Sequence, residues 1–392
     1  MRTTGTVSRG IRTPIIKRGD NLIEIVASSL LSAAQEEGFS FQDHDVVGIT
    51  EAVVARAQGN YATLDQISKD VSTKFPGGEI GLVFPILSRN RFSQILRGIV
   101  GGVNKIHIQL SYPADEVGNH LISLDQIDDK GIDPYLDIID EAHFRGLFGK
   151  TPHPFTGVDY IDYYKELCQG KAEIILANDP RAILAYASEV ITADIHTRIR
   201  TKRLLLAAGA KKVLGLDEIL NAPVDGGGFH PQYGLLGSNL ATDDSVKLFP
   251  RDTQQFVDTL SERLYELTGK HIEALVYGDG AFKDPVGGIW ELADPVVSPG
   301  YTAGLIGTPN ELKLKYIADN ELTGLSSNDA AEAMRELIKH KKQDLVNDMS
   351  SQGTTPRRLT DLLGSLCDLT SGSGDKGTPV VLIQGYFDTY AD

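Results

Sequence analysis

A glycine-rich stretch near the end of the chain, residues 372–378 with the sequence GSGDKGT, is the segment most suggestive of chemistry. Glycines let backbone N–H groups approach an anion closely, and a lysine neutralises phosphate charge. The stretch is not a Walker A loop, which needs G-x-x-x-x-G-K-[ST] between a strand and a helix, whereas here we expect a helix before it and a strand after it. Two interpretations stay open: contact with a nucleotide phosphate, or a flexible turn.

Acidic residues follow an expected strand over residues 271–277. Asp279 stands between two glycines and Asp284 follows shortly afterwards. Carboxylates at strand ends in α/β folds commonly face a ligand crevice, and Mg²⁺ prefers carboxylate and phosphate oxygens. The segment therefore predicts either a magnesium site or an ordinary Asp-Gly turn.

Two strand-to-helix junctions carry cations that could reach an anionic ligand. At the first, Thr50 ends an apolar strand, Glu51 begins a helix and Arg56 follows within that helix. An arginine in this position can reach a bound phosphate or form a surface salt bridge. The second junction is the most basic run of the chain, residues 194–203.

The basic run places His196, Arg198 and Arg200 at the expected start of a helix. Cations at a helix start are disfavoured by the helix dipole, and a bound carboxylate or phosphate would offset this cost. The alternative is a solvated basic helix. No H-E-x-x-H or G-x-S-x-G motif occurs, which disfavours a catalytic zinc and a serine hydrolase.

The elements that must position these residues alternate between strand and helix, which predicts an α/β fold. The first 80 residues read as two strand–helix pairs, with a buried strand over 45–50 and a helix over 51–57. Strands expected over 105–110, 172–177, 189–194 and 212–216, with helices between them, predict a parallel sheet. The loop over 221–228 is the clearest break, and helices over 253–267, 326–348 and 356–369 and a final strand over 379–384 follow.

Composition limits the function class. The 392 residues carry a net charge of −15, which argues against a general nucleic-acid binder. No apolar run approaches the ~20 residues that span a bilayer, and the basic start lacks the apolar core of a secretory signal. The two cysteines, Cys168 and Cys367, are far apart and suit core packing in a reducing cytoplasm. We therefore expect a cytoplasmic protein that binds neither nucleic acid nor membrane.

Four motifs in order resemble a known family. They are the G-x-x-x-P-x-I element over 10–22, the D-V-x-x-x-T strand and helix over 45–59, the central part at 237–239 and 266–277, and the terminal loop and strand over 372–385. In this order the sequence resembles the coenzyme F(420)-0:L-glutamate (gamma-glutamyl) ligases. The resemblance implies a ligase-like core over 1–85 and 230–392, and an inserted parallel α/β domain over 86–229.

The resemblance also implies a reaction in which GTP or ATP phosphorylates a carboxylate, and the amine of glutamate or a similar compound attacks the acyl phosphate. Such a reaction needs phosphate positioning and a divalent cation, Mg²⁺ or Mn²⁺, more than a protein nucleophile. Asp279 and Asp284 are the candidate metal ligands, and His196, Arg198 and Arg200 of the insertion would bind the acidic small-molecule substrate. By resemblance, the nucleotide would contact Gly10, Thr13, Pro14, Thr50, Glu51, Arg56, Asn239, Gly372, Ser373, Gly374, Asp375, Lys376 and Gly377.

The sequence departs from the family pattern at three positions. Leu236 stands where the family has an aspartate, Ser373 where it has a Glu or Gln metal ligand, and Gly278-Asp279 where it has an Asp-Thr pair. We therefore expect a family member with a diverged substrate. The alternative is a non-catalytic nucleotide- or ligand-binding protein on the same scaffold. A homodimer is implied by resemblance only.

Overall fold

The computed structural model describes residues 3–89, 91–153, 156–279, 296–345, 348–351, 357–371 and 375–391. The chain forms two units: Met1–Val54 with Asp252–Asp392, and Ala55–Arg251. The expected insertion over 86–229 lies within the second unit, and its bounds stay a prediction. The mixed α/β fold predicted from the sequence is confirmed. None of the described helices has the length and apolarity needed to cross a membrane.

The first unit combines both ends of the chain in one five-stranded sheet of order β1-β14-β2-β12-β13. The central strands β14 and β2 are almost wholly buried, as their continuous apolar sequences predict. In chain order the unit contains β1 (Val7–Ile11), α1 (Leu22–Glu37), β2 (Val46–Thr50), α9 (Thr253–Thr268), β12 (Glu273–Asp279), β13 (Val296–Tyr301), the 3₁₀ helix η3 (Ala303–Leu305), α10 (Leu314–Asn320), α11 (Ser327–Lys339), α12 (Leu359–Ser371) and β14 (Val380–Gln384). The helix expected over 326–348 therefore ends at Lys339.

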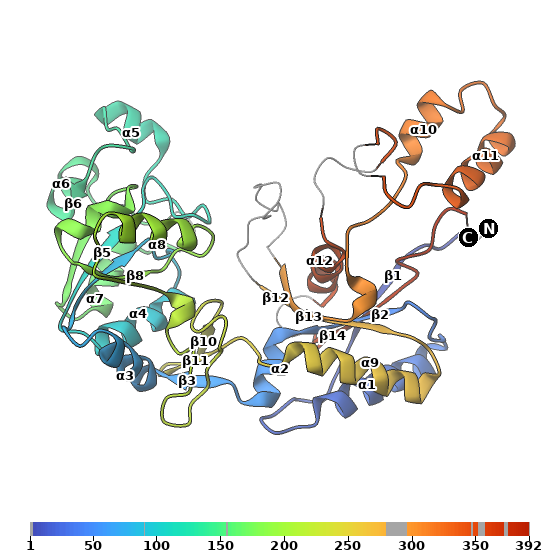
Figure 1. Cartoon of the computed structure of the whole chain (residues 1–392), viewed down its shortest axis with the longest axis horizontal. Helices are drawn as coiled ribbons and strands as arrows, with labels where there is room; N and C mark the ends of the chain where they lie inside the picture. Colours follow the sequence, from blue (N-terminus) through green and yellow to red (C-terminus); the bar gives the residue numbers. More distant parts are fainter. Residues whose placement is uncertain are drawn as a thin grey trace. The chain divides into compact units, whose positions relative to one another are not determined.

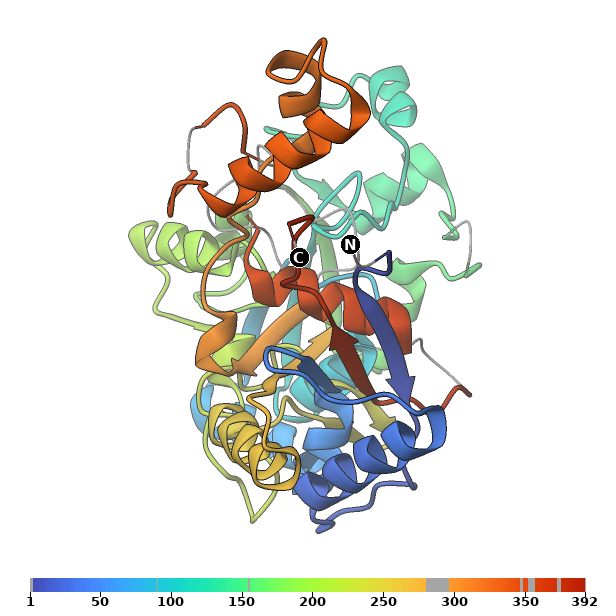
Figure 2. The same ribbon diagram turned by 90° about the vertical axis from the view of Figure 1, so that its right-hand side faces the viewer.

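Helices cover both faces of this sheet. Figures 1 and 2 show α12 on one face, with α1 and α9 on the other. Alternate strand residues supply the two faces: Val46, Leu275 and Val381 pack with Leu363 and Cys367 of α12. Gly48 gives Cys367 its space, because a Cβ at residue 48 would lie 2.3 Å from the Cys367 Sγ. The prediction that Cys367 is a core residue is confirmed.

The second unit contains a six-stranded sheet of order β6-β7-β5-β4-β8-β9 and a small sheet of order β10-β11-β3. The five strands from β7 to β9 are parallel, which confirms the predicted parallel sheet. The boundary between units falls in α2 (Glu51–Gln58). There follow β3 (Tyr61–Thr63), α3 (Leu64–Lys74), β4 (Glu79–Val83), α4 (Phe92–Gly101), β5 (Lys105–Leu110), α5 (Leu124–Lys130), β6 (Ile139–Asp140), α6 (Glu141–Phe148), α7 (Tyr160–Leu167), β7 (Ala172–Leu176), η1 (Pro180–Ala185), β8 (Glu189–Thr192), α8 (Arg198–Ala207), β9 (Lys212–Gly215), η2 (Leu216–Glu218), β10 (Asn239–Thr242) and β11 (Ser245–Lys247).

The parallel strands follow the doubly wound order in which the first strand lies at the centre. The chain runs from β4 outward through β5 to β7, and then returns to place β8 and β9 on the other side of β4. The direction of winding thus reverses between β4 and β8. In open α/β sheets, the crevice outside the carboxyl ends of the strands at such a reversal is the usual ligand position.

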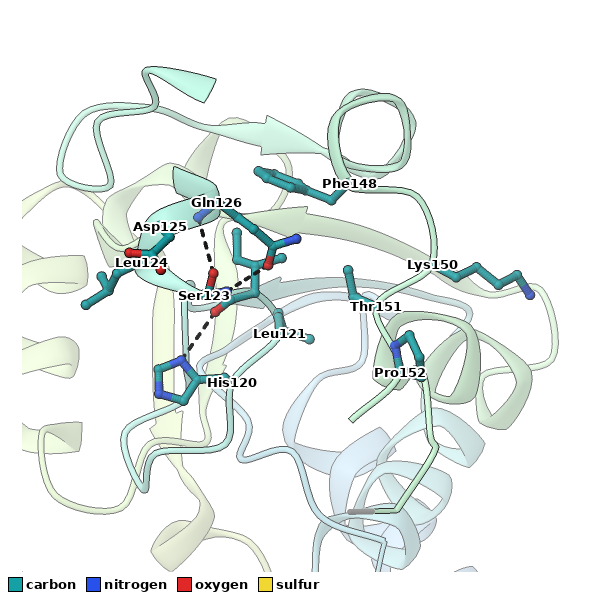
Figure 3. Close-up of a pocket in the computed structure, with 11 residues that line it drawn as sticks. His120, Leu121, Ser123, Leu124, Asp125, Gln126, Phe148, Lys150, Thr151 and Pro152 are labelled. Carbon is teal, nitrogen blue, oxygen red and sulfur yellow. Dashed lines mark hydrogen bonds between the residues drawn. The ribbon is translucent and has the colours of Figure 1, made fainter. Parts of the chain in front are cut away.

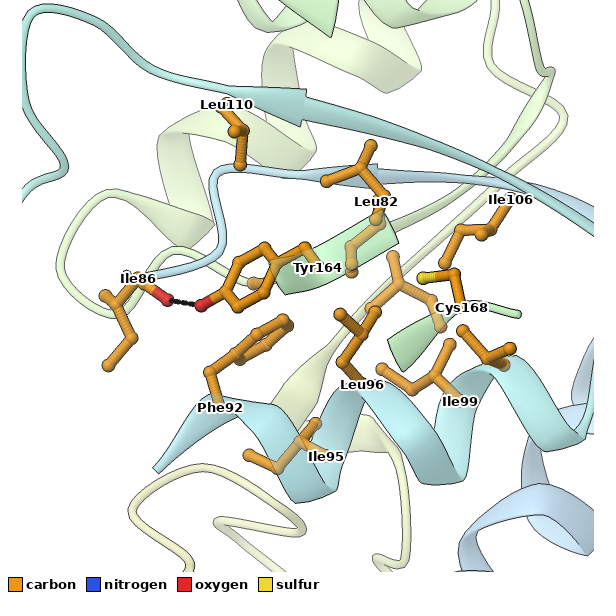
Figure 4. Packing of buried hydrophobic residues seen from close by; sticks show 14 of the residues in the cluster. Leu82, Ile86, Phe92, Ile95, Leu96, Ile99, Ile106, Leu110, Tyr164 and Cys168 are labelled. Atoms are coloured by element: carbon orange, nitrogen blue, oxygen red, sulfur yellow. Dashed lines mark hydrogen bonds between the residues drawn. The ribbon is translucent and has the colours of Figure 1, made fainter. Parts of the chain in front are cut away.

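The core of the second unit fills the space between the sheet and helices α3, α4 and α7. Figure 4 shows Phe92 and Leu96 of α4 facing Tyr164 and Cys168, beneath strand residues such as Leu82. The Tyr164 hydroxyl is buried and donates to the Ile86 carbonyl oxygen. Burial raises the pKa of Cys168 to about 12, so this thiol stays protonated and inert, and its predicted role in core packing is confirmed.

Helices α3 and α4 pack closely because α4 presents glycine to α3. A Cβ at Gly98 would lie 2.7 Å from the Cβ of Ile67, whereas a Cβ at Gly146 of α6 would meet nothing within 4 Å. We expect Gly98→Ala to lower the free energy of unfolding by about 1–3 kcal/mol through overpacking. Gly146→Ala, the matched control, should leave it unchanged or raise it by about 0.5–1 kcal/mol. Urea unfolding followed by circular dichroism measures both, and equal effects would contradict the packing argument.

Candidate functional site

One edge of the five-stranded sheet gathers chain segments that the sequence analysis selected. β2 and β12 are parallel, and β14 runs antiparallel between β1 and β2. The carboxyl ends of β1, β2 and β12 and the amino end of β14 therefore share this edge. The register places Ile11 beside Val380, Val380 beside Ile49, and Ile49 beside Val276. The residues that follow this row are the candidates for chemistry. We call this end of the sheet, where β1, β2 and β12 finish and β14 begins, the sheet edge; the term does not refer to an outer strand.

The segment before β14 is tied to β1 and β2 at the sheet edge. The Thr50 N–H donates to the Pro379 carbonyl oxygen at 3.0 Å, and the Arg12 Nε donates to the Lys376 carbonyl oxygen at 3.3 Å. A Cβ at Gly10 would lie 3.1 Å from the Thr378 side chain, so the two segments are in close contact. The exposed side chains of Arg12 and Lys376 place two cations on neighbouring segments.

Other nucleotide-site residues predicted from the sequence lie in the same segments. Thr13 and Pro14 follow β1, and the Thr13 hydroxyl donates to the Pro14 carbonyl oxygen at 3.0 Å. Asp375 and Gly377 are exposed on either side of Lys376. The predicted residues Gly372, Ser373 and Gly374 lie outside the described residues.

Glu51 and β12 meet where β2 gives way to α2. Thr50 pairs with Tyr277 in the sheet, and the next residue of β12, Gly278, lies directly against the Glu51 side chain. A Cβ at residue 278 would lie 2.1 Å from the Glu51 Cγ, so glycine is required for this contact. The backbone of Asp279, the predicted metal ligand, ends β12 one residue later. Asp284, the second predicted ligand, lies outside the described residues.

Two predicted nucleotide contacts belong to the second unit. Arg56 is exposed in the last turn of α2. Asn239 begins β10, pairs with Lys247 of β11, and its side-chain oxygen accepts from the Leu240 N–H at 2.9 Å. The structure places both residues in the second unit. Their contacts with a nucleotide stay predictions.

The basic run of the second unit is partly neutralised by acidic residues that follow β9. The Arg198 Nε lies 3.7 Å from the Asp217 carboxylate, and Lys202 pairs with Glu218. Arg200 is exposed and lowers the pKa of Asp179, after the larger effect of Arg181. The run therefore carries less unneutralised positive charge than its sequence indicates. Arg200 and Arg203 are the exposed cations of the run.

Two acidic side chains, one half-buried and one buried, lie beside His196, and the sequence analysis did not select them. The loop after β5 brings Glu116 to the start of α8, where its carboxylate accepts from the N–H of Ile195 and, at 3.1 Å, from the N–H of His196. Asp194 is buried, and one of its oxygens accepts from the hydroxyls of Thr197 and Thr201, each at 2.6 Å. Both acids follow parallel strands, so the strand-end rule that selected Asp279 could also have selected them.

Glu116 carries the most perturbed carboxyl group of this loop. Burial raises its pKa to about 7, with a further increase from the nearby Asp194 and Asp115 charges, and the two backbone hydrogen bonds oppose the rise. Burial also raises the pKa of Asp194, against the hydrogen bonds of the two threonines. A carboxyl group that titrates near neutral pH can donate or accept a proton under ordinary conditions.

Comparison with known proteins identifies a family model that covers nearly the whole chain. The model described as F420-0:Gamma-glutamyl ligase matches residues 10–385, nearly the whole chain. No curated protein matches the chain. The matched range includes both the sheet edge of the first unit and the entire second unit.

The raised pKa of Glu116 predicts a pH dependence of stability. Its pKa is near 4.5 when unfolded and about 7 when folded, so between these values the folded state binds more protons. The contribution of Glu116 is therefore greatest at low pH and is lost as pH rises to 7, by at most roughly 3 kcal/mol. We expect the free energy of unfolding of the wild type, relative to Glu116→Gln, to fall by about 1–3 kcal/mol from pH 5 to 8 in urea titrations. Glu166→Gln, on the exposed face of α7, is the control, and equal pH profiles for wild type and Glu116→Gln would contradict the assignment.

Proposed function

The chain belongs to the F420-0:gamma-glutamyl ligase family, and from this premise we propose that it joins a carboxylate to an amine at the expense of GTP or ATP. Family membership identifies it as an enzyme of the ligase class. The proposed substrates are an acidic small molecule and glutamate or a similar amine, with an acyl phosphate as the intermediate.

The observation that supports this proposal is the convergence of segments at the sheet edge. Arg12 and Lys376 bring positive charge from neighbouring segments, and Glu51 stands where β2 ends. Phosphoryl transfer is catalysed mainly by positioning and charge stabilisation, which these groups can supply without a nucleophilic side chain. The positive charges of Arg12 and Lys376 suit a polyphosphate, and the negative charge of Glu51 suits a cation bound to that polyphosphate.

The reaction would proceed in two steps. First, a substrate carboxylate oxygen attacks the γ-phosphorus, the bond from that phosphorus to the β–γ bridging oxygen breaks, and a nucleoside diphosphate leaves. The amine nitrogen then attacks the acyl carbon, inorganic phosphate leaves and the amine loses a proton. Arg12 and Lys376 would hold the phosphates, while His196, Arg198 and Arg200 are proposed to bind the acidic substrate. Arg56 and Asn239 are proposed to contact the nucleotide.

A divalent cation fits the donor chemistry of the sheet edge. Magnesium is commonly held by one or two carboxylates together with substrate phosphates. Glu51 follows the last residue of β2 and Asp279 ends the parallel neighbour β12, so two oxygen-donor residues share the edge. Among the described residues no cluster of three His, Cys, Asp or Glu side chains could hold a metal. When bound, Mg²⁺ or Mn²⁺ would neutralise charge on the transferred phosphoryl group.

The proposed reaction is tested by nucleotide turnover. We expect release of GDP or ADP only when a carboxylate and an amine are both present, assayed with L-glutamate and a panel of di- and tricarboxylic acids, with the amide product identified by mass spectrometry. Asp279→Asn should lower turnover by about 100-fold or more, because it removes a carboxylate from the proposed cation site. Asp258→Asn, on exposed α9, is the matched control.

The outcome of this assay separates the two functional hypotheses. Calorimetry with GTP and ATP, with and without Mg²⁺, accompanies the turnover measurement. Nucleotide binding that needs no cation and leads to no product would favour the non-catalytic alternative. Unchanged turnover in Asp279→Asn would remove Asp279 from the site. A homodimer is also proposed from the family, and sedimentation measures it directly.

The contact between Gly278 and Glu51 gives a second prediction. Gly278→Ala would displace the Glu51 side chain, because the new Cβ would overlap its Cγ. The displaced group is a flexible side chain, so we expect the fold to persist while kcat/KM for nucleotide turnover falls by about 10-fold or more. Gly5→Ala, where a Cβ meets nothing within 4 Å, is the control. Full activity of Gly278→Ala would show that the position of Glu51 is unimportant.

A further inference from the structure

We propose that the second unit carries a self-association surface, in which the acidic and apolar segment 124–138 of one copy docks on the exposed face of α8 in a second copy. We call the segment the acidic knob, and we call the face of α8 formed by Ile199, Arg203 and Leu206 the basic stripe. None of these residues has a role in the proposed ligase reaction. The contact is also separate from the homodimer proposed from the family.

The acidic knob exposes three apolar side chains that are close together in the sequence. Tyr135 is 85% exposed, Leu136 79% and Ile138 54%, and they precede the edge strand β6. Figure 1 shows α5, which begins the knob, protruding from the second unit. Single exposed apolar residues are normal on a protein surface, whereas a group of them marks a site of interaction.

The backbone of the knob is held by hydrogen bonds from the interior of the unit. The hydroxyl of the buried Tyr112 donates to the Asp137 carbonyl oxygen at 2.8 Å, and the side-chain amide of Asn178 donates to the Pro134 carbonyl oxygen at 3.0 Å. The two most exposed apolar side chains lie between these two carbonyl groups. They are therefore presented by an ordered turn, which lowers the entropy cost of binding a partner.

Negative charge accompanies the apolar side chains of the knob. Residues 124–138 contain five aspartates and one lysine, and all five aspartates are exposed. Asp128 and Asp129 lie in the last turn of α5, where the helix dipole disfavours negative charge. Figure 3 shows Leu124 and Asp125 side by side, both directed away from the hollow between α5 and α6. A partner that brings positive charge and an apolar surface fits this combination.

The outer face of α8 offers such a surface. Ile199, Arg203 and Leu206 recur at intervals of four and three residues, so they form one stripe along the helix. Ile199 is 76% exposed and Leu206 48%, and Arg203 between them is exposed as well. The opposite side of α8 carries the buried Thr201 and Leu205. The helix therefore has apolar residues on both sides, although its inner side alone packs on its own unit.

Charge decides which surfaces of two copies can meet. With a net charge of −15, two copies repel each other unless their contact brings opposite charges together. Within the basic run, Arg198 lies near Asp217 and Lys202 pairs with Glu218, whereas Arg203 takes no part in these pairs. The stripe is thus a basic surface that an acidic knob can approach. Each copy carries both surfaces, so a two-fold arrangement would form the contact twice.

Sedimentation velocity of the full chain over a range of protein concentrations measures this association. We expect reversible association of the wild type that weakens as NaCl is raised from roughly 0.05 to 0.5 M, because salt screens the charges. Tyr135→Ser should raise the dissociation constant by about 10-fold at either salt concentration, because it removes an exposed aromatic side chain from the contact. Tyr265→Ser, which changes an exposed tyrosine of α9, is the matched control.

Charge reversal tests whether the two surfaces are partners. The pair Asp128→Lys and Asp129→Lys in one variant, and Arg203→Glu in another, should each weaken self-association by about 10-fold or more, because like charges would then meet. An equimolar mixture of the two variants should associate as tightly as the wild type, since each knob then finds a stripe of opposite charge. Glu262→Lys with Glu332→Lys, in the first unit, alters the net charge as much as the knob variant and is the control.

The outcomes separate this contact from the other proposals. Restored association in the mixture would support the inference, whatever the result of the nucleotide turnover assay. A homodimer formed through the first unit alone would be insensitive to both charge reversals, and that result would overturn the inference. A wild type without concentration-dependent association, or a mixture that associates no more tightly than either variant alone, would overturn it as well.

Discussion

The hydrogen-bonded register around β2 is the constraint on which the candidate site depends. β2 lies between β14, which is antiparallel to it, and β12, which is parallel. This mixed pairing places the carboxyl end of β2 beside the carboxyl end of β12 and the amino end of β14. β2 and β12 are more than 200 residues apart in the sequence, and β12 and β14 are about 100 residues apart, yet all three reach the sheet edge. A shift of one residue in either pairing would turn the side chains of the shifted strand to the other face of the sheet.

The second unit arranges polar groups by a different geometry. Its sheet is parallel from β7 to β9, so all five carboxyl ends point the same way, and the loops that follow them carry Glu116, Asp194 and the start of α8. Backbone N–H groups of Ile195 and His196 are already satisfied by Glu116. The proposed acidic substrate would therefore meet the Glu116 carboxylate at the start of α8. Arg200, further along the helix, is the more accessible cation for such a substrate.

The sequence predicted the elements better than their contacts. Continuous apolar runs such as residues 45–50 predicted buried strands correctly, because burial on both faces leaves a clear signal. β4 was not selected, although it is the central strand of the second sheet, because Glu79 and two glycines beside it interrupt the pattern. Long-range pairing, such as that of β1 with β14, depends on packing of both ends of the chain and has no local signal.

The sequence also predicted the sheet edge segments and missed the buried groups. Gly10, Thr50, Glu51 and Lys376 were selected from motifs, and the structure brings their segments together. Glu116 was missed, because its properties come from burial and from partners in another loop. Short-range sequence patterns contain no record of desolvation, which raises the pKa of Glu116.

The position of β14 has a consequence for biosynthesis. This strand lies inside the first sheet, between β1 and β2, yet it leaves the ribosome only after the whole second unit has been synthesised. The second unit is continuous in sequence from Ala55 to Arg251 and can acquire its core while translation continues. Until β14 is synthesised and inserted between them, β1 and β2 each have a row of unpaired backbone N–H and C=O groups. Production of the protein in cells is therefore most vulnerable to aggregation in this interval, and truncation before β14 removes the centre of the sheet and not merely a tail.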